Sequence, residues 1–186
     1  MGHLAAREGY RRLVDRLNRF PQGAAPSERL YRILEILFSP REAELVAQLP
    51  IKPFRTATAA KAWGLSLTEA ARVLQGLASR AILLDLDGDG EPVYVLPPPM
   101  AGFFEFSMMR VRGDIDQKRL AELYFEYMNV EEGFIKDLFV RGETHLGRTF
   151  VRERSVPPEL SLSVLDFERA SHVIHCASFI GVSLCY

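Results

Sequence analysis

Apolar side chains recur every three or four positions in several stretches of the chain, which is the spacing of one face of an α-helix. In residues 4–20 the apolar stripe is Tyr10, Leu13, Val14 and Leu17, and the arginines around it are Arg7, Arg11, Arg12, Arg16 and Arg19. A second such stretch starts at Ser27, and a third ends near Leu49. The pattern predicts three helices before residue 50. The arginines of the first one form either a surface for nucleic acid or an acidic partner or, as we expect in preference, a solvated basic face.

Capping signals predict a helix-turn-helix between residues 56 and 79. A short helix over residues 56–63 ends at Gly64, and Ser66 with Glu69 has the spacing of a capping box that opens the next helix. Ser39 and Glu42 give the same signal earlier in the chain. The inward positions of the helix after Ser66 are Ala70, Val73, Leu74 and Leu77. Two helices joined by a three-residue turn are typical of a helix-turn-helix.

Residues 82–86 and 92–96 flank an Asp-Gly-Asp-Gly turn at residues 87–90, which predicts a β-hairpin. A hairpin directly after a helix-turn-helix makes a winged helix, so we expect this fold over residues 27–96. From Asp85 onward the turn also matches the first six positions of a calcium-binding loop. The twelfth position, where a bidentate glutamate is required, is Leu96. A polar hairpin turn is therefore the better interpretation.

Three consecutive prolines at positions 97–99 break the chain, because proline fixes φ and donates no backbone N–H. A strongly apolar segment follows them, and it contains Phe103, Phe104, Phe106, Met108 and Met109. We expect residues 97–113 to be a proline hinge that leads into a buried helix of about two turns. Its largely covered side chains should be Phe103, Phe104, Phe106 and Met109, packed against both halves of the chain or against a second copy.

Beyond the hinge, Asp114 and Gln117 predict the start of a helix whose buried stripe is Leu120, Leu123, Tyr124 and Tyr127. Further helices are expected at residues 131–139 and 165–177, short strands or extended loops at 141–165, and a final strand at 179–185. The predicted fold class is α+β and helix-rich: an N-terminal winged helix-turn-helix, a proline hinge and a small α+β C-terminal portion. The corresponding sections are 1–26, 27–96, 97–113 and 114–186.

Composition and charge narrow the classes of protein. The chain has 186 residues, of which 48% are hydrophobic and 25% charged, as in an ordinary globular protein. Residues 1–80 carry 13 Lys and Arg against 7 Asp and Glu, whereas residues 81–186 carry 10 against 17. No apolar run approaches the roughly 18–20 residues of a membrane span, so we expect a cytoplasmic chain without membrane contact. Two cysteines, Cys176 and Cys185, are too few for a disulfide framework and should be reduced thiols.

The expected winged helix raises the question of DNA binding. Its candidate DNA-contacting residues are Thr68, Arg72, Gln75 and Ser79, with Glu69 beside them. The wing carries Asp85, Asp87, Asp89 and Glu91, where contacts to phosphate would require lysine or arginine. Only the positive excess of residues 1–80 favours DNA. We therefore expect protein docking or a structural role in preference to DNA binding.

Candidate metal and catalytic residues are few. His172, His175 and Cys176 lie at i, i+3 and i+4, so on a helix they share a face that suits zinc or iron, but no fourth ligand is nearby and packing is the alternative role. His145 has no Ser or Cys partner at an informative spacing. The chain has no P-loop, dinucleotide fingerprint or nucleophile elbow. We therefore expect a protein that is not an enzyme.

Four distinctive segments are spread over essentially the whole chain. They are PPPMAGFFEFSMMR, GDIDQKRLAELYFEYMN, VLDFERAS and the terminal GVSLCY. Together, after a winged helix, they resemble the N-terminal region of a family of bacterial 4Fe-4S ferredoxin-type iron–sulfur proteins. In that family the segment similar to LCY is followed by another cysteine, a basic stretch and a cysteine-rich region that holds the clusters. The resemblance implies that Cys185 is the first cysteine of an incomplete ligand set, with 4Fe-4S clusters only in the full-length protein and none in this chain.

Two hypotheses from different functional classes follow. In the first, the chain is the docking and scaffold part of an iron–sulfur electron-transfer protein, and its partner is a redox protein, the missing C-terminal cluster domain or a second copy of the chain. In the second, the winged helix belongs to a DNA-binding transcriptional regulator whose C-terminal portion senses a signal. The acidic wing favours the first hypothesis.

Overall fold

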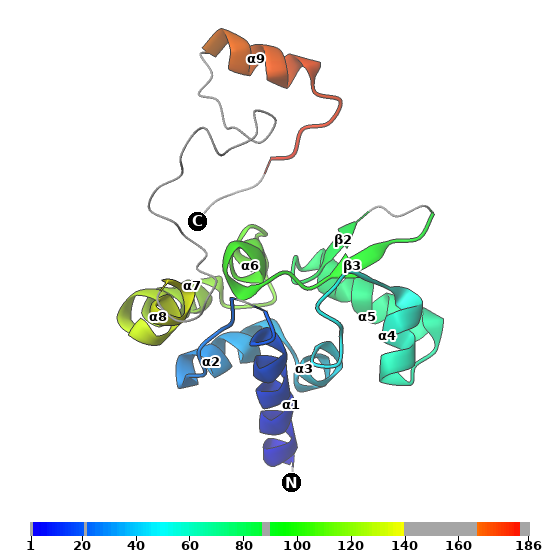
Figure 1. The fold of residues 1–186 in the computed structure, drawn as a ribbon, viewed down its shortest axis with the longest axis vertical. Helices are drawn as coiled ribbons and strands as arrows, with labels where there is room; N and C mark the ends of the chain where they lie inside the picture. Colours follow the sequence, from blue (N-terminus) through cyan, green and yellow to red (C-terminus); the bar gives the residue numbers. More distant parts are fainter. Residues whose placement is uncertain (1, 21, 87–89, 140–166, 183–186) are drawn as a thin grey trace. The chain divides into compact units, whose positions relative to one another are not determined.

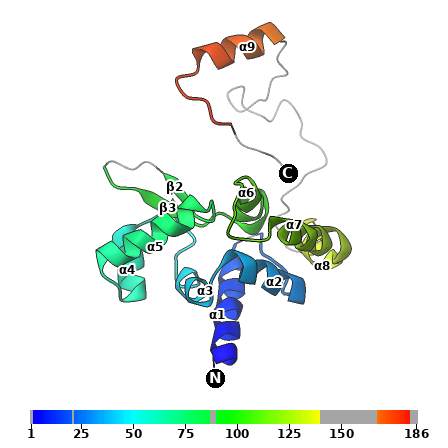
Figure 2. The ribbon, with the colours of Figure 1, turned by 180° about the vertical axis from the view of Figure 1, so that it is seen from behind.

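The computed structural model describes residues 2–20, 22–86, 90–139 and 167–182. These residues belong to two compact units, one containing residues 2–139 and the other residues 167–182. The chain is helix-rich with one small antiparallel sheet, so the coarse α+β class expected from the sequence is confirmed. Figures 1 and 2 show the ribbon from opposite sides.

The helices of the first unit begin close to the predicted positions. They are α1 (Gly2–Leu17), α2 (Glu28–Leu37), α3 (Pro40–Val46), α4 (Thr56–Trp63), α5 (Leu67–Ser79), α6 (Phe104–Met108), α7 (Gln117–Phe125) and α8 (Glu132–Phe139). Two short segments precede α6 and α8: η1 (Pro99–Phe103), whose backbone is kinked, and η2 (Glu126–Val130), which is π-helical. Both predicted capping boxes form, since Ser39 with Glu42 opens α3 and Ser66 with Glu69 opens α5. Gly64 ends α4 at a φ of 63°, a left-handed conformation that glycine adopts without steric cost.

Three short strands form the sheet, β1 (Phe54–Arg55), β2 (Leu84–Leu86) and β3 (Val93–Val95), in the order β1-β3-β2 with both pairings antiparallel. Asp85 of β2 lies opposite Tyr94 of β3, and Phe54 of β1 lies opposite Tyr94 on the other side. The predicted hairpin pairing of residues 82–86 with 92–96 is therefore confirmed, whereas most of its turn, residues 87–89, lies outside the described residues. In both views of the first unit, the sheet with α4 and α5 lies on one side of α6, and α7 with α8 on the other (Figures 1 and 2).

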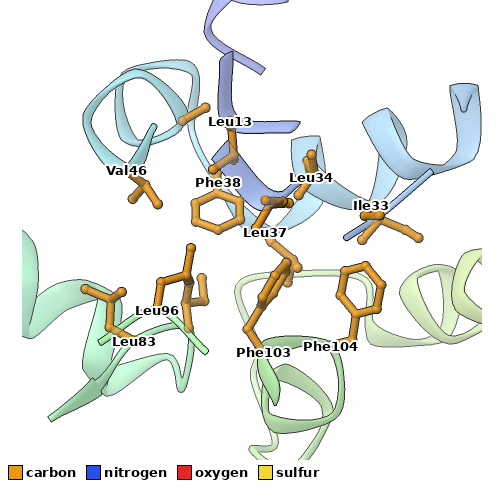
Figure 3. Packing of buried hydrophobic residues seen from close by; sticks show 14 of the residues in the cluster. Leu13, Ile33, Leu34, Leu37, Phe38, Val46, Leu83, Leu96, Phe103 and Phe104 are labelled. Carbon is orange, nitrogen blue, oxygen red and sulfur yellow. The ribbon is translucent and has the colours of Figure 1, made fainter. Parts of the chain in front are cut away.

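Buried side chains from α1 to α8 form one continuous hydrophobic core. Figure 3 shows its centre, where Leu83 and Leu96 lie below Val46 and Phe38, and Phe103 and Phe104 lie below Leu37 and Ile33. Every section that the sequence predicts thus contributes to the same core, namely 1–26, 27–96, 97–113 and the first part of 114–186. At the surface beside this core, the guanidinium of Arg29 in α2 pairs with Glu126 and Glu131, about a hundred residues further along the chain.

The proline segment is less helical than predicted. After Pro99 the backbone leaves the helical region at residues 100–102, and Ala101 has a φ of 52°. The carboxylate of Glu105 accepts hydrogen bonds from the backbone N–H groups of Ala101 and Gly102, both at 3.0 Å. These bonds hold the left-handed residue in place, and only the five residues of α6 remain helical. The expected buried helix of two turns is therefore corrected to a kink and a single short turn.

The burial expected for this segment is partly corrected. Phe103 and Phe104 are buried, Phe106 is half-buried and Met109 is 38% exposed. Because α6 ends at Met108, the next side chain falls at the rim of the core instead of inside it. The two buried rings are the ones that contact each other, with centroids 4.8 Å apart in an edge-to-face arrangement.

Two further predictions about helix and strand ends are wrong. Asp116, not Asp114, caps α7 by accepting a hydrogen bond from the backbone N–H of Arg119 at 2.9 Å. Asp114 instead pairs with Arg112.

In the second unit, α9 (Phe167–Cys176) confirms the predicted helix, but residues 179–182 are not a strand. The segment 141–165 lies outside the described residues.

Candidate docking surface

The outward face of α5 is the candidate binding surface that the sequence singles out. Its predicted outward residues are all exposed, and they are Thr68, Glu69, Arg72, Gln75 and Ser79. On the opposite face, Ala70, Leu74 and Leu77 are buried in the core and fix the orientation of the helix. The sequence periodicity therefore assigned both faces of α5 correctly.

A shallow hollow of about 610 Å³ lies along this face. Its lining is Thr56 of α4, Leu67, Thr68, Ala71, Arg72 and Gln75 of α5, and Glu91 before β3. Three of the four predicted DNA-contacting residues thus come together, whereas Ser79 lies at the end of the helix and donates its hydroxyl to the Gly76 carbonyl at 3.0 Å. Leu67 is 61% exposed beside the hollow, so the surface offers an apolar contact as well as polar ones.

The charges around the hollow offset one another or are negative. Arg55 of β1 pairs with Glu91 at 3.2 Å, which offsets the charge of this arginine. Glu69 accepts hydrogen bonds from the hydroxyl and the backbone N–H of Ser66, which lower its pKa and keep the carboxylate ionised. Asp85 on β2 is exposed and adds a negative charge to the wing. Arg72 is the exposed cation of α5 that faces the hollow, and Asp87 and Asp89 lie outside the described residues.

The structure does not support a calcium-binding loop, because the residue at the last ligand position, Leu96, cannot bind calcium. Leu96 is fully buried in the hydrophobic core, next to Leu83 (Figure 3). The segment that enters the loop is β2 and not the helix that an EF-hand requires. Both observations agree with a polar hairpin turn.

The candidate metal residues of the second unit all lie on α9 and are exposed. The Sγ atom of Cys176 is 3.6 Å from Nε2 and 3.8 Å from Nδ1 of His172, whereas His175 has no such contact to the thiol. Among the described residues, no group of three or more His, Cys, Asp or Glu side chains is arranged to hold a metal ion. Cys185, the cysteine assigned by resemblance, lies outside them.

An apolar groove of about 290 Å³ was not anticipated from the sequence. Its lining is Phe104, Glu105, Met108 and Met109 on one side and Ala121, Tyr124 and Met128 on the other. The hydroxyl of Tyr124 lies 3.0 Å from Oγ of Ser107, and burial raises the pKa of this tyrosine well above its usual value. The groove depends on packing between α6 and the α7–η2 segment, so the spacing within either stretch gives no signal for it.

A second hollow, of about 410 Å³, lies between α1 and α2. Its lining carries both signs of charge, from Arg7, Glu8, Arg11, Glu28 and Glu35, together with Tyr10 and Tyr31. Glu8 and Arg11 lie 3.8 Å apart on the same helix. Because the opposite charges offset one another, this hollow favours neither anions nor cations.

Arg16 contradicts the expectation of a solvated basic face on α1. Its side chain is fully buried and donates hydrogen bonds from Nε to the Leu49 carbonyl at 3.0 Å and from Nη2 to the Pro50 carbonyl at 2.6 Å. Its guanidinium carbon also lies 5.5 Å from the ring centre of Phe20. Burial lowers the pKa of Arg16 to about 10. This arginine therefore joins α1 to the loop after α3.

Comparisons with known proteins do not assign the chain to a family. A scan of protein-family models gives no match, and searches of curated proteins and of solved structures give no significant match. Among the described residues, no helix is both long and apolar enough to cross a membrane.

Proposed function

We propose that this chain is a non-catalytic docking and scaffold region of an iron–sulfur electron-transfer protein of the 4Fe-4S ferredoxin type, working in the cytoplasm. In this proposal residues 27–96 act as a winged helix that binds a protein. The element order α3, β1, α4, α5, β2, β3 and the sheet order β1-β3-β2 support the winged-helix assignment. The iron–sulfur assignment is supported by the resemblance of the four segments, and in it Cys185 begins a ligand set that residues beyond this chain complete.

The character of the α5 surface is the observation that favours a protein partner. Nucleic acid binds through the release of counterions from phosphates, which requires several unpaired Lys or Arg side chains on one surface. The hollow beside α5 has Arg72 as its exposed cation, Arg55 is paired with Glu91, and Asp85 is negative. An exposed leucine, Leu67, next to polar groups is instead the composition of a protein-docking surface.

The alternative is a DNA-binding transcriptional regulator. It is favoured by the positive excess of residues 1–80 and by the helix-turn-helix order of α4 and α5. In that case Thr68, Arg72, Gln75 and Ser79 would contact DNA, and Arg72 would supply the phosphate or base contact.

An electrophoretic mobility assay separates these two functions. We expect the purified chain to bind generic duplex DNA more weakly than about 1 µM at physiological salt, because its wing is acidic and α5 offers one exposed arginine. The matched variants are Arg72→Ala on α5 and Lys118→Ala on α7, which both remove one exposed positive charge. Submicromolar binding that weakens steeply with salt and is lost in Arg72→Ala but not in Lys118→Ala would establish the regulator instead.

Anaerobic reconstitution with iron and sulfide tests the iron–sulfur part of the proposal. A cubane cluster is ordinarily held by four cysteine thiolates, and this chain has two cysteines. We expect the 186-residue chain to remain colourless and iron-free, and a version extended into the natural sequence beyond Tyr186 to bind clusters. Cys185→Ser in the extended version tests the assigned ligand. A stoichiometric cluster on the 186-residue chain, or none on the extended one, would disprove the iron–sulfur assignment.

A further inference from the structure

Helices α1 and α2 lie side by side (Figures 1 and 2), and the hollow of about 410 Å³ between them carries opposite charges on its two walls. Arg7 and Arg11 stand one turn apart on the α1 wall, and Glu28 and Glu35 stand two turns apart on the α2 wall. We propose that this hollow binds a small zwitterion of dipeptide size, whose carboxylate contacts the α1 wall and whose ammonium group contacts the α2 wall. This site is separate from the α5 surface and from the iron–sulfur ligand set proposed above.

The lack of ion pairs across the hollow is the observation that carries this proposal. In the part of the chain that the structure describes, neither arginine pairs with a glutamate of the opposite wall, and Arg11 instead lies 3.8 Å from Glu8 on its own helix. Arg7, Glu28 and Glu35 are exposed and stay unpaired. A simple anion or cation is attracted by one wall and repelled by the other, whereas a molecule that carries both signs is attracted by both.

The dimensions of the hollow set the length of the ligand. Sites for small molecules have volumes of about 300–1,000 Å³, so a hollow of about 410 Å³ suits a small one. The axes of packed helices lie roughly 8–10 Å apart, so the two charged groups of the ligand must be well separated to reach both walls. A free α-amino acid carries both charges on one carbon. A dipeptide separates them by more than one Cα–Cα spacing of about 3.8 Å and is therefore the better fit.

Two tyrosines complete the lining between the charged walls. Tyr10 is buried, and its hydroxyl donates a hydrogen bond to the Phe38 carbonyl at 2.7 Å, which holds this side of the hollow in place. Burial, with a smaller effect from the nearby Glu35 carboxylate, raises the pKa of Tyr10 to about 12, so this hydroxyl remains a donor at neutral pH. Tyr31 is half-buried, and its hydroxyl makes no hydrogen bond to another described residue. The Tyr31 ring therefore offers an apolar contact and its hydroxyl a polar one to a bound peptide.

Titration of the full 186-residue chain with the dipeptide Ala-Phe, followed by NMR chemical shifts of the backbone amides, tests the site. Two matched analogues each lack one charge: N-acetyl-Ala-Phe has no ammonium group, and Ala-Phe amide has no carboxylate. We expect Ala-Phe to bind with a Kd of about 1 mM, and each analogue to bind at least about threefold more weakly, because exposed ion pairs each contribute modestly. Added salt should weaken the binding of Ala-Phe, since the charges on both walls are exposed.

Matched variants assign each wall. Arg7→Gln should weaken the binding of Ala-Phe and of N-acetyl-Ala-Phe by about threefold without weakening that of Ala-Phe amide, and Glu35→Gln should do the reverse. Arg12→Gln is the control, because Arg12 is exposed on α1 but does not line the hollow, and it should bind Ala-Phe as the native chain does. Circular dichroism checks that each variant keeps its helices.

Three results would overturn the proposal. They are no chemical-shift change at about 10 mM Ala-Phe, an analogue that binds as tightly as Ala-Phe, and an Arg12→Gln variant that loses as much affinity as Arg7→Gln. None of them depends on DNA binding or on an iron–sulfur cluster.

Discussion

Replacing Phe104 with alanine is expected to lower the free energy of unfolding by about 3–5 kcal/mol, because the truncation leaves a cavity in the hydrophobic core. Phe104 is 2% exposed. Its ring centre lies 4.8 Å from that of Phe103 and 4.9 Å from that of Tyr124, and the rings of Tyr127 and Phe134 are also in contact range. Urea denaturation followed by far-ultraviolet circular dichroism measures the loss.

Met109→Ala is the matched control in the same segment. Met109 is 38% exposed, so its truncation removes less buried area and should cost about 1 kcal/mol or less. Phe106, which is half-buried, should fall between the two. Equal midpoints for Phe104→Ala and Met109→Ala would show that the Phe104 ring is not enclosed in solution and that α6 does not join α2 to α7.

The elements that could be predicted from the sequence are those decided within a few residues. The capping boxes at Ser39 and Ser66 each need a hydroxyl and a glutamate three positions later, and each forms with both hydrogen bonds. The helix over residues 56–63 has both of its predicted ends, because Gly64 supplies a local stop signal. The outward face of α5 follows in the same way from the spacing of Leu74 and Leu77.

The elements that could not be predicted depend on particular hydrogen bonds between a side chain and the backbone, which the spacing of apolar residues does not encode. The sequence predicts that Asp114 and Gln117 open the helix together. The Gln117 side chain instead donates to the Arg110 carbonyl and accepts from the backbone N–H of Arg112, and Asp116 caps α7. The kink at Ala101 is held by Glu105, and no propensity scale anticipates an alanine with positive φ. At both places a side-chain hydrogen bond to a nearby backbone group overrides the local conformational preference.

The same distinction applies to the candidate sites. The neighbouring positions of His172 and Cys176 followed from their i, i+4 spacing, whereas their donor distance required coordinates. The hollow beside α5 needs Glu91 and Thr56, which the sheet and α4 bring to the helix from outside it. The groove between Met108 and Met128 joins segments twenty residues apart, and neither segment carries a pattern that points to the other.

Arg16 illustrates why a helical stripe alone misjudges a charged residue. It stands next to Leu13 and Leu17 on α1, where the long side chain passes under the loop that follows α3. Its two acceptors, the carbonyls of Leu49 and Pro50, lie more than thirty residues away in sequence. The spacing of arginines around an apolar stripe cannot reveal such acceptors, so the sequence predicts that Arg16 is exposed to solvent.

The energetic balance at Arg16 can be estimated from opposing terms. Burial, together with the nearby charge of Arg19, lowers the pKa of Arg16 to about 10, so the site disfavours the charged form of this side chain. Against this, two hydrogen bonds from a charged donor contribute about 1.5–3 kcal/mol each. Removing the arginine also leaves two carbonyl oxygens without a donor, at about 1–3 kcal/mol for each that stays buried. Nη1 of Arg16 is buried without a hydrogen-bond partner, which adds to the cost of burying the arginine. The loss expected on substitution therefore comes mainly from the two carbonyl oxygens that would be left without a donor.

We therefore expect Arg16→Met, which keeps most of the side-chain volume, to lower the free energy of unfolding by about 2–4 kcal/mol. Arg16→Lys keeps the charge but cannot donate to both carbonyls with one planar group, so it should fall between Arg16→Met and the native chain. Arg19→Met is the matched control, because Arg19 is exposed in the turn that follows α1, and it should change stability by less than about 0.5 kcal/mol. Urea titrations of the three variants measure these differences. If Arg16→Met were as stable as the native chain, the cost of burying the charge would equal the value of its hydrogen bonds, and Arg16 would not hold α1 against the loop after α3.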